Sequence, residues 1–288
     1  MILITGATGQ LGTSVVNQLL TKLSTDQFVV TSSNERGVQS LINKGLHARL
    51  ANFSDIETLN DAFEGIDTLL LISTMDPNRL EQHKNVIDAA KAKGVQHIVY
   101  TSLAIKDIEI SAVKELMISH FETEAYIKSS GLKYTILRNT MYAEALTQIL
   151  GPNALTQSIQ LPGGTGKVPY ALRREMGEAT ANLLLQAPKA NAIYNITGDT
   201  LYSYEDIAHT LKTFTTYPIE YENIDEVEFV ENLKDMGFPD FAIYLHSGTL
   251  ADIKHHQYEI LDTTLSSLLG RAPADAATFL KEIFNINH

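Results

Sequence analysis

The sequence predicts an α/β protein in which a doubly wound parallel sheet is followed by a smaller α+β C-terminal lobe. Short apolar segments alternate with longer amphipathic ones over the first 140 residues. Right-handed crossovers turn such alternation into a parallel sheet that is covered by helices on both faces. Residues 69–72 are continuously apolar, as in a strand buried on both sides. A glycine-rich turn joins the first apolar segment to the first amphipathic one.

The first region is expected to contain six strands with helices between them. The strands are expected at residues 2–5, 28–31, 47–51, 68–72, 96–101 and 134–137. The first helix carries Leu11, Val15, Leu19 and Leu23 as a stripe at helical spacing. Further helices are expected at residues 56–63, 79–93 and 113–129, because each of these segments is followed within two residues by a glycine.

Beyond residue 150 the rhythm changes, and prolines and glycines mark loops. Helices are expected at residues 174–187 and 203–213, strands at 192–197 and 219–222, and further helices after that. Ser203 followed by Asp206 three residues later is typical of a capping box. We expect a domain at residues 1–150 and a smaller lobe at 151–288, which packs on it because no long polar linker separates the two.

Composition excludes several classes of protein and partner. The 288 residues carry a net charge of −12, which disfavours a nucleic-acid partner. The lack of cysteine excludes disulfides and thiolate metal sites. No apolar stretch approaches the length of a membrane span, and the N-terminus resembles no export signal, so a cytoplasmic protein without a membrane partner is expected. The oligomeric state is left open.

The turn Gly6-Ala7-Thr8-Gly9-Gln10-Leu11-Gly12 lies between an expected strand and an expected helix. Dinucleotide binding in a Rossmann sheet requires this arrangement, because the glycines allow a tight turn, a close approach to the diphosphate and close packing of helix on strand. The helix N-terminus then offers free N–H groups to the phosphates. The alternative is a tight turn without a ligand. The predicted cofactor-binding residues here are Gly6, Thr8, Gly9, Gln10, Leu11 and Gly12.

The G-x-x-G-x-x-G spacing resembles that of the short-chain dehydrogenases, whose usual catalysts are a tyrosine and a lysine four residues later. None of the twelve tyrosines has a lysine at that distance. The nearest cases are Tyr134 with Arg138 and Tyr170 with Arg174. The chain is therefore expected either to transfer hydride without this pair or only to bind the nucleotide.

Several segments together strengthen the resemblance. They are residues 1–12 (MILITGATGQLG), 69–73 (LLLIS), 82–90 (QHKNVIDAA), 100–103 (YTSL), 120–124 (HFETE) and 137–142 (LRNTMY). In this order they resemble the NmrA-like atypical short-chain dehydrogenases, specifically the branch of type 2 NAD(P)H:quinone oxidoreductases and triphenylmethane reductases. The resemblance implies an NADPH-binding Rossmann domain, a small C-terminal lobe and a substrate cleft between them.

The end of the second expected strand bears on the choice between NADPH and NADH. No acid stands at its tip to bind the ribose, which disfavours strict use of NAD. The family has an arginine near Ser33 that pairs with the 2′-phosphate, and the serine here is a departure. Arg36 could bind this phosphate, with hydrogen bonds from Ser33 and Asn34, or it could be a solvated loop charge. We predict a preference for NADPH, with NAD use also possible.

Other cofactor contacts are expected at the carboxyl ends of the strands, where open α/β sheets bind ligands. Ile72, Ser73 and Thr74 are expected to line the adenine-ribose and diphosphate side, and Thr101 and Ser102 to approach the nicotinamide ribose. The family resemblance places Arg138 and Asn139 near the nicotinamide. The alternative for each of these residues is that it only caps a strand.

Two residues are candidates for catalysis. His120 occupies the place where some NmrA-like relatives carry lysine, and it is expected to hydrogen-bond near the nicotinamide ribose or to donate a proton, because histidine titrates near neutrality. The alternative is a core histidine paired with Glu124 or with the backbone. Tyr142 is expected to stack on a flat acceptor or to donate a proton; the alternative is simple packing.

No metal site and no phosphate loop is predicted. Residues 163–167 lack the glycine and the Ser/Thr that a phosphate loop requires around its lysine. His255 and His256 are adjacent, with no further ligand nearby in the sequence, as in a solvated surface pair.

The leading hypothesis is an NADPH-dependent enzyme that transfers hydride to quinones or similar flat, electron-poor acceptors. The second is an NmrA-like protein that binds the dinucleotide as a redox sensor without turnover, which the absent Tyr-Lys pair allows. An epimerase-like enzyme that retains its cofactor is disfavoured by the same absence.

Overall fold

The structure, a computed structural model, describes residues 1–186 and 190–286. The chain forms two compact units. The first comprises Met1–Leu103, Ile118–Asn139 and Arg173–Tyr194, and the second comprises Ala104–Met117, Thr140–Leu172 and Asn195–His288. A domain boundary after residue 150 stays a prediction. Ala187, the expected last residue of one helix, lies outside the described residues.

A seven-stranded sheet in the order β3-β2-β1-β4-β5-β6-β8 confirms the predicted doubly wound fold. The pairings from β3 through to β6 are all parallel. The register aligns Ser102 with Arg138 and Leu103 with Asn139, so β5 and β6 end at the same edge of the sheet. The strands are β1 (Ile2–Ile4), β2 (Phe28–Ser32), β3 (Ala48–Leu50), β4 (Thr68–Leu71), β5 (His97–Leu103), β6 (Lys133–Asn139) and β8 (Ala192–Ile196).

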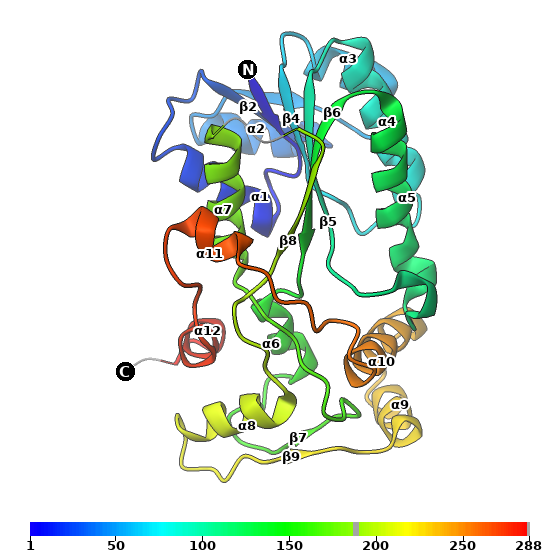
Figure 1. Cartoon of the computed structure of the whole chain (residues 1–288), viewed down its shortest axis with the longest axis vertical. Helices are drawn as coiled ribbons and strands as arrows, with labels where there is room; N and C mark the ends of the chain where they lie inside the picture. Colours follow the sequence, from blue (N-terminus) through cyan, green and yellow to red (C-terminus); the bar gives the residue numbers. More distant parts are fainter. Residues whose placement is uncertain (187–189, 287–288) are drawn as a thin grey trace. The chain divides into compact units, whose positions relative to one another are not determined.

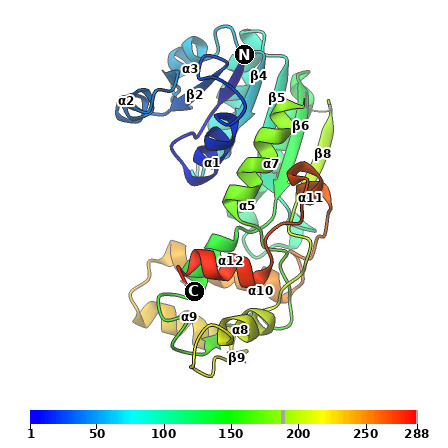
Figure 2. The same ribbon diagram turned by 90° about the vertical axis from the view of Figure 1, so that its left-hand side faces the viewer.

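Helices cover both faces of this sheet. Figure 1 shows α1 and α7 on one face and α4 with α5 on the other, and Figure 2 shows α1 and α7 side by side. The helices that contribute to the first unit are α1 (Gln10–Leu19), α2 (Glu35–Asn43), α3 (Ile56–Ala62), α4 (Arg79–Ala92), α5 (Lys114–Ser130) and α7 (Arg173–Leu185).

The core of the first unit follows from the strand period of two. Leu69 and Leu71 on β4, and Ile98 and Tyr100 on β5, point to one face and are completely buried in one cluster. The same cluster includes Val86 of α4. Tyr100 is the polar member of this group, and its hydroxyl must find a partner inside the core.

Two elements that were expected in the smaller lobe pair or pack with elements of the first unit instead. The expected strand at 192–197 is β8, which lies beside β6, and the expected helix at 174–187 is α7, which packs against α1. Gly177 explains the close packing, because a Cβ atom there would lie 2.4 Å from the Cβ of Ser14. Such a contact is set by tertiary structure and leaves no periodic pattern in the sequence.

Helix α2 was not predicted from the sequence. The residues after β2 were expected to form a loop, whereas the helix begins directly after Asn34. Asn34 caps this helix by accepting a hydrogen bond from the N–H of Gly37 at 2.9 Å. Val38 and Leu41 form its buried face.

The second unit contains a two-stranded sheet and several helices. Ser203 and Asp206 form the predicted capping box at the start of α8. No helix in the described part of the chain is both long enough and apolar enough to cross a membrane. The elements are η1 (Ile108–Ile110), η2 (Ala143–Ala145), α6 (Leu146–Ile149), β7 (Ile159–Gln160), α8 (Tyr204–Lys212), β9 (Tyr221–Glu222), α9 (Glu226–Asp235), α10 (Asp240–Lys254), α11 (Thr264–Leu269) and α12 (Ala276–Ile283), with the N-terminal part of α5.

Candidate active site

The turn between β1 and α1 requires its first and last glycines. Gly6 has a φ of +63°, which L side chains rarely adopt. At Gly12 a Cβ atom would lie 2.2 Å from the carbonyl oxygen of Gly6. Gly9 is less restricted, since its Cβ would meet only that same oxygen at 3.3 Å. The glycines at both ends are therefore needed to build the turn, whereas the middle glycine is the least restricted of the three.

The N-terminus of α1 fits a bound anion. Gly9 is its N-cap residue, and no side chain caps this end. The N–H groups of Gln10, Leu11 and Gly12 consequently have no acceptor within the helix. The first turn holds no acidic residue, and the helix dipole places partial positive charge there. Thr8, Gly9 and Gln10 are exposed, so a diphosphate can reach this end of the helix.

The residues expected to bind the adenosine ribose lie around the start of α2. Ser33 and Arg36 are exposed, and Asn34 uses its side-chain oxygen to cap the helix. Arg36 thus lies in the first helical turn and not in a loop, which corrects the loop position considered from the sequence. Glu35 precedes it in the same turn.

The ends of β4 and β5 are joined by polar side chains. The N–H of Ser73 donates to the hydroxyl oxygen of Thr101 at 2.9 Å, and the Thr101 hydroxyl lies 3.3 Å from that of Ser73. The N–H of Ile72 donates to the hydroxyl of Thr5 at the end of β1. The Ile72 side chain lies beside Gly6. The structure therefore brings Ile72, Ser73 and Thr101 together next to the glycine turn.

The segment that follows β4 is held by a residue that the sequence analysis did not single out. Arg79, the first residue of α4, is completely buried. Its guanidinium donates to the carbonyl of Thr74 and, at 2.9 Å, to the hydroxyl of Ser119 on α5. A buried arginine must satisfy its donors in this way, and here they fix the backbone at Thr74. Nothing in the sequence distinguished Arg79 from the exposed cations.

His120 is paired with Tyr100. Its Nδ1 atom lies 3.0 Å from the Tyr100 hydroxyl, and only 7% of the residue is exposed. Burial lowers the pKa of His120 well below its ordinary value, and the nearby charge of Arg79 and the proximity of His83 lower it further. This burial disfavours the titration near neutrality that was expected from the sequence, and the role of His120 in proton donation stays a prediction. The alternative of a core histidine agrees with this burial, but the partner is Tyr100 and not Glu124, which bonds to Ser102 and Arg138.

Glu124 joins the ends of β5 and β6. Its carboxylate accepts a hydrogen bond from Ser102 at 2.7 Å and two from Arg138, at 2.8 and 2.7 Å. Burial alone would raise the pKa of Glu124, but the hydrogen bonds from Arg138 and Ser102 outweigh it and leave the pKa below its ordinary value. The side chains of Ser102 and Arg138 are thus directed at Glu124, and their contact with a cofactor stays a prediction.

Asn139, at the end of β6, has a buried amide without a protein partner. The residue is 4% exposed, and both its Nδ2 and its Oδ1 lack a hydrogen-bond partner. Buried amides are nearly always paired, so an unpaired amide at this position calls for an explanation, and a bound ligand is one. Together with the unpaired N–H groups of α1, this side chain fits a dinucleotide that carries both a diphosphate and a carboxamide.

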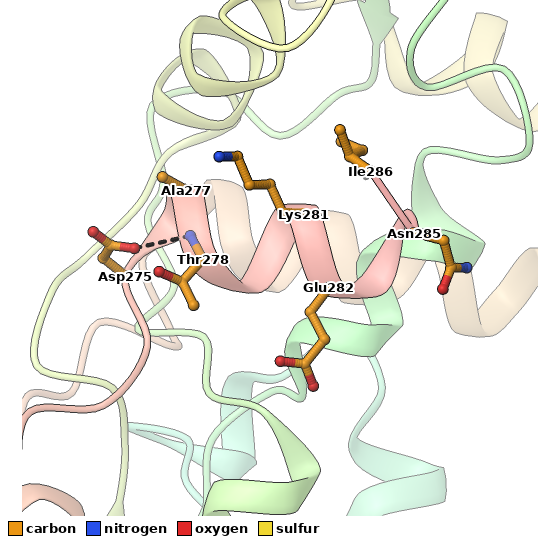
Figure 3. Close-up of a pocket in the computed structure, with 7 residues that line it drawn as sticks. All are labelled: Asp275, Ala277, Thr278, Lys281, Glu282, Asn285 and Ile286. Carbon is orange, nitrogen blue, oxygen red and sulfur yellow. Dashed lines mark hydrogen bonds between the residues drawn. The ribbon is translucent and has the colours of Figure 1, made fainter. Parts of the chain in front are cut away.

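Tyr142 belongs to the second compact unit. It is half-buried, precedes η2 as its N-cap residue and forms a bridge with Ala171. The other predicted site residues all lie in the first unit. A hollow in the second unit lies along α12 and contains none of the predicted site residues. Figure 3 shows its lining, with Asp275 bonded to the backbone of Thr278.

Comparison with known proteins decides the family. The model of the NmrA-like family matches residues 1–268. The chain belongs to the NmrA-like family. This NmrA-like chain is 34% identical to quinone oxidoreductase 2 of Escherichia coli strain K12 over 291 residues, which cover 100% of both proteins. The resemblance predicted from the sequence is therefore confirmed.

Solved structures of two reductases share the fold. One is the NADPH-dependent quinone oxidoreductase of E. coli in complex with NADPH, with a TM-score of 0.90 and 32% identity over 99% of this chain and 100% of that one. The other is the triphenylmethane reductase of Citrobacter sp. in complex with NADP(H), with a TM-score of 0.87 and 26% identity over 97% of this chain and 99% of that one.

Proposed function

We propose that this protein is an NADPH-dependent oxidoreductase that reduces quinones or similar flat, electron-poor acceptors. The observation that carries the proposal is the full-length similarity to the quinone oxidoreductase of E. coli, together with a glycine turn built for a diphosphate. Bound NADPH supplies the hydride, and the protein contributes binding, orientation and a proton.

The first helix binds the diphosphate in this proposal. The N–H groups of Gln10, Leu11 and Gly12 donate to it, since they have no acceptor within the helix. Gly6 and Gly12 shape the turn, and Thr8 is exposed beside it. Gly9 has no side chain, so the phosphates can approach the backbone of the turn closely.

The start of α2 selects NADPH over NADH. Arg36 is exposed and follows the N-cap residue of the helix, where its guanidinium is free to form two hydrogen bonds with a phosphate. Ser33 and the amide nitrogen of Asn34 supply further donors. Glu35 in the same turn repels the negatively charged 2′-phosphate, so we expect the preference for NADPH to be modest.

The end of β4 lines the adenine-ribose and diphosphate side, and the ends of β5 and β6 form the nicotinamide side. Ser73 is hydrogen-bonded to Thr101, and Arg79 donates a hydrogen bond to the carbonyl of Thr74. These bonds fix the strand ends before any ligand binds. The unpaired amide of Asn139 is suited to a carboxamide, which offers the complementary donor and acceptor.

Ser102 and Arg138 act through Glu124, which holds the ends of β5 and β6 together and thereby orients Asn139. His120 serves as a neutral hydrogen-bonding group, because burial keeps it uncharged. Tyr142, in the second unit, supplies an aromatic ring for a flat acceptor or a phenolic proton.

A direct assay of NADPH oxidation tests the proposed function. Purified protein is mixed with NADPH and a panel of quinones, nitro compounds and triphenylmethane dyes, and the absorbance of the reduced cofactor is followed. We expect quinone-dependent loss of this absorbance. Tight binding of NADPH without its consumption by any acceptor would instead favour a dinucleotide-binding redox sensor, the alternative that the sequence also allowed.

A further inference from the structure

On one face of the sheet, two side chains of β5 meet two side chains of α5. Tyr100 and Ser102 are two residues apart on β5, so their side chains point to the same face. His120 and Glu124 are four residues apart on α5 and also share a face. The result is two parallel contacts, with Tyr100 bonded to His120 at 3.0 Å and Ser102 bonded to Glu124 at 2.7 Å.

Both members of the first contact are neutral. Tyr100 is completely buried, and this burial raises the pKa of its hydroxyl far above the ordinary value. His120 is buried and its pKa is lowered by that burial and by Arg79 and His83, which approach it from α4. The pair therefore shares two protons, one on the phenol and one on the imidazole.

Two groups near the Tyr100 hydroxyl can accept its proton, Nδ1 of His120 and the oxygen of Thr123. Thr123 has already committed its hydroxyl proton to the carbonyl of Ser119 at 2.8 Å, and its oxygen lies 3.1 Å from Nδ1 of His83. If Tyr100 donates to Nδ1 of His120, the phenolic proton and the Nδ1 lone pair are both satisfied. The proton of the imidazole then resides on Nε2.

We propose that Tyr100 is a positioning residue that holds His120 in the Nε2–H tautomer, so that Nε2 is the hydrogen-bond donor of this imidazole. The consequence for the reaction rests on the proposed function, in which His120 hydrogen-bonds near the reacting groups. Tyr100 touches neither cofactor nor substrate in this account. It acts by fixing the ring orientation and the atom that carries the proton.

The tautomer can be measured without any turnover. The ring nitrogens of the nine histidines are labelled with ¹⁵N, and the signals of His120 are assigned as those missing from His120→Asn. We expect Nδ1 of His120 to be unprotonated and Nε2 protonated in the parent protein without cofactor. Tyr100→Phe keeps the ring and removes only the hydroxyl, so we expect a mixture of tautomers in this variant. Protonated Nδ1 in the parent, which would mean that Tyr100 donates to another acceptor such as Thr123, overturns the proposal.

Enzyme kinetics provide a second test of the positioning role of Tyr100. In Tyr100→Phe we expect kcat with a quinone to fall by about tenfold with the Kd of NADPH unchanged, less than the roughly hundredfold loss typical of removing a catalytic donor outright. Tyr170→Phe is the control, because Tyr170 is an equally buried tyrosine in the other compact unit. An equal fall in kcat in both variants overturns the positioning role. If the parent protein fails to oxidise NADPH with every quinone tested, the proposed function is contradicted instead. The NMR result still decides the tautomer in that case.

Discussion

Arg138 binds Glu124 through two hydrogen bonds, one to each carboxylate oxygen, and Glu124 is 1% exposed. Ser102 donates to the same carboxylate from the neighbouring strand. One acidic side chain of α5 thereby links two strand ends that are 36 residues apart in sequence, Ser102 and Arg138, and that face each other in the sheet register. Asn139 follows Arg138 directly, so its orientation depends on this link.

Replacing Glu124 by Gln is expected to destabilise the folded protein by about 3 kcal/mol, because it leaves the guanidinium of Arg138 without its counter-charge in a largely buried site. The free energy of unfolding in urea measures this change. Glu81→Gln is the matched control, since Glu81 pairs with Lys84 on the surface and its loss is expected to cost less than about 1 kcal/mol. Equal losses in the two variants would contradict the role of Glu124.

The same residue gives the protein a defined acid sensitivity. The pKa of Glu124 in the folded state lies below its ordinary value of 4.5. The stability that its charged form contributes is therefore fully present above that ordinary value and is lost as the pH falls through the lower, folded-state pKa. Below about pH 4 we expect the stability of the parent to fall more steeply with pH than that of Glu124→Gln. Parallel stability curves for the two proteins would contradict this expectation.

The sequence predicted the parts of the site that depend on local structure. The glycine turn, the strand before it and the helix that follows it are specified by residues close together in the chain. The strand-end positions of Ser73, Thr101 and Asn139 followed from the rule that parallel sheets bind ligands at their carboxyl edge.

The side-chain partners could not be predicted, because they are set by tertiary packing. Nothing local distinguishes Arg79, which is completely buried, from the solvated lysines around it. The pairing of His120 with Tyr100 and not with Glu124 depends on which face of α5 meets β5. One usable signal was missed: the strand spacing of Tyr100 and Ser102 matches the helical spacing of His120 and Glu124.

The glycine turn can be tested by separating folding from binding. Gly9→Ala adds a methyl group that meets only the Gly6 carbonyl oxygen, at 3.3 Å, so we expect the variant to fold with a Tm close to that of the parent. Its affinity for NADPH is expected to fall by at least tenfold, since the methyl group stands where the diphosphate approaches the backbone. Fluorescence titration with NADPH measures the affinity.

Gly12→Ala should behave differently, because its Cβ would lie 2.2 Å from a backbone oxygen and the helix must shift. We expect a loss of stability of about 2 kcal/mol or more in addition to weaker binding. Asn17→Ala, on the exposed side of the same helix, is the control for both measurements. Unchanged NADPH binding in Gly9→Ala would remove the basis of the proposed site.

Arg36 can be tested through the ratio of the two cofactor affinities. Arg36→Gln is expected to weaken NADPH binding by about tenfold, the loss of one charge-assisted contact, and to leave NADH binding unchanged. Lys44→Gln removes a nearby exposed cation at the other end of α2 and serves as the control. A parallel loss of affinity for both cofactors would show that Arg36 does not read the 2′-phosphate.

Asn139→Ala distinguishes a ligand-binding amide from a structural one. Both polar atoms of this buried side chain lack a protein partner, so its removal breaks no hydrogen bond in the free protein. We expect the free energy of unfolding without cofactor to change by less than about 1 kcal/mol, because the relief of an unpaired amide offsets the small cavity. The stabilisation by saturating NADPH should nevertheless be smaller in Asn139→Ala than in the parent, since it follows the affinity.

Asn85→Ala is the opposite case, because that amide donates to the carbonyl of Phe53 at 3.0 Å. It should lower the stability of the free protein and leave the effect of NADPH intact, whereas the reverse result for the two variants would mean that Asn139 has a structural partner.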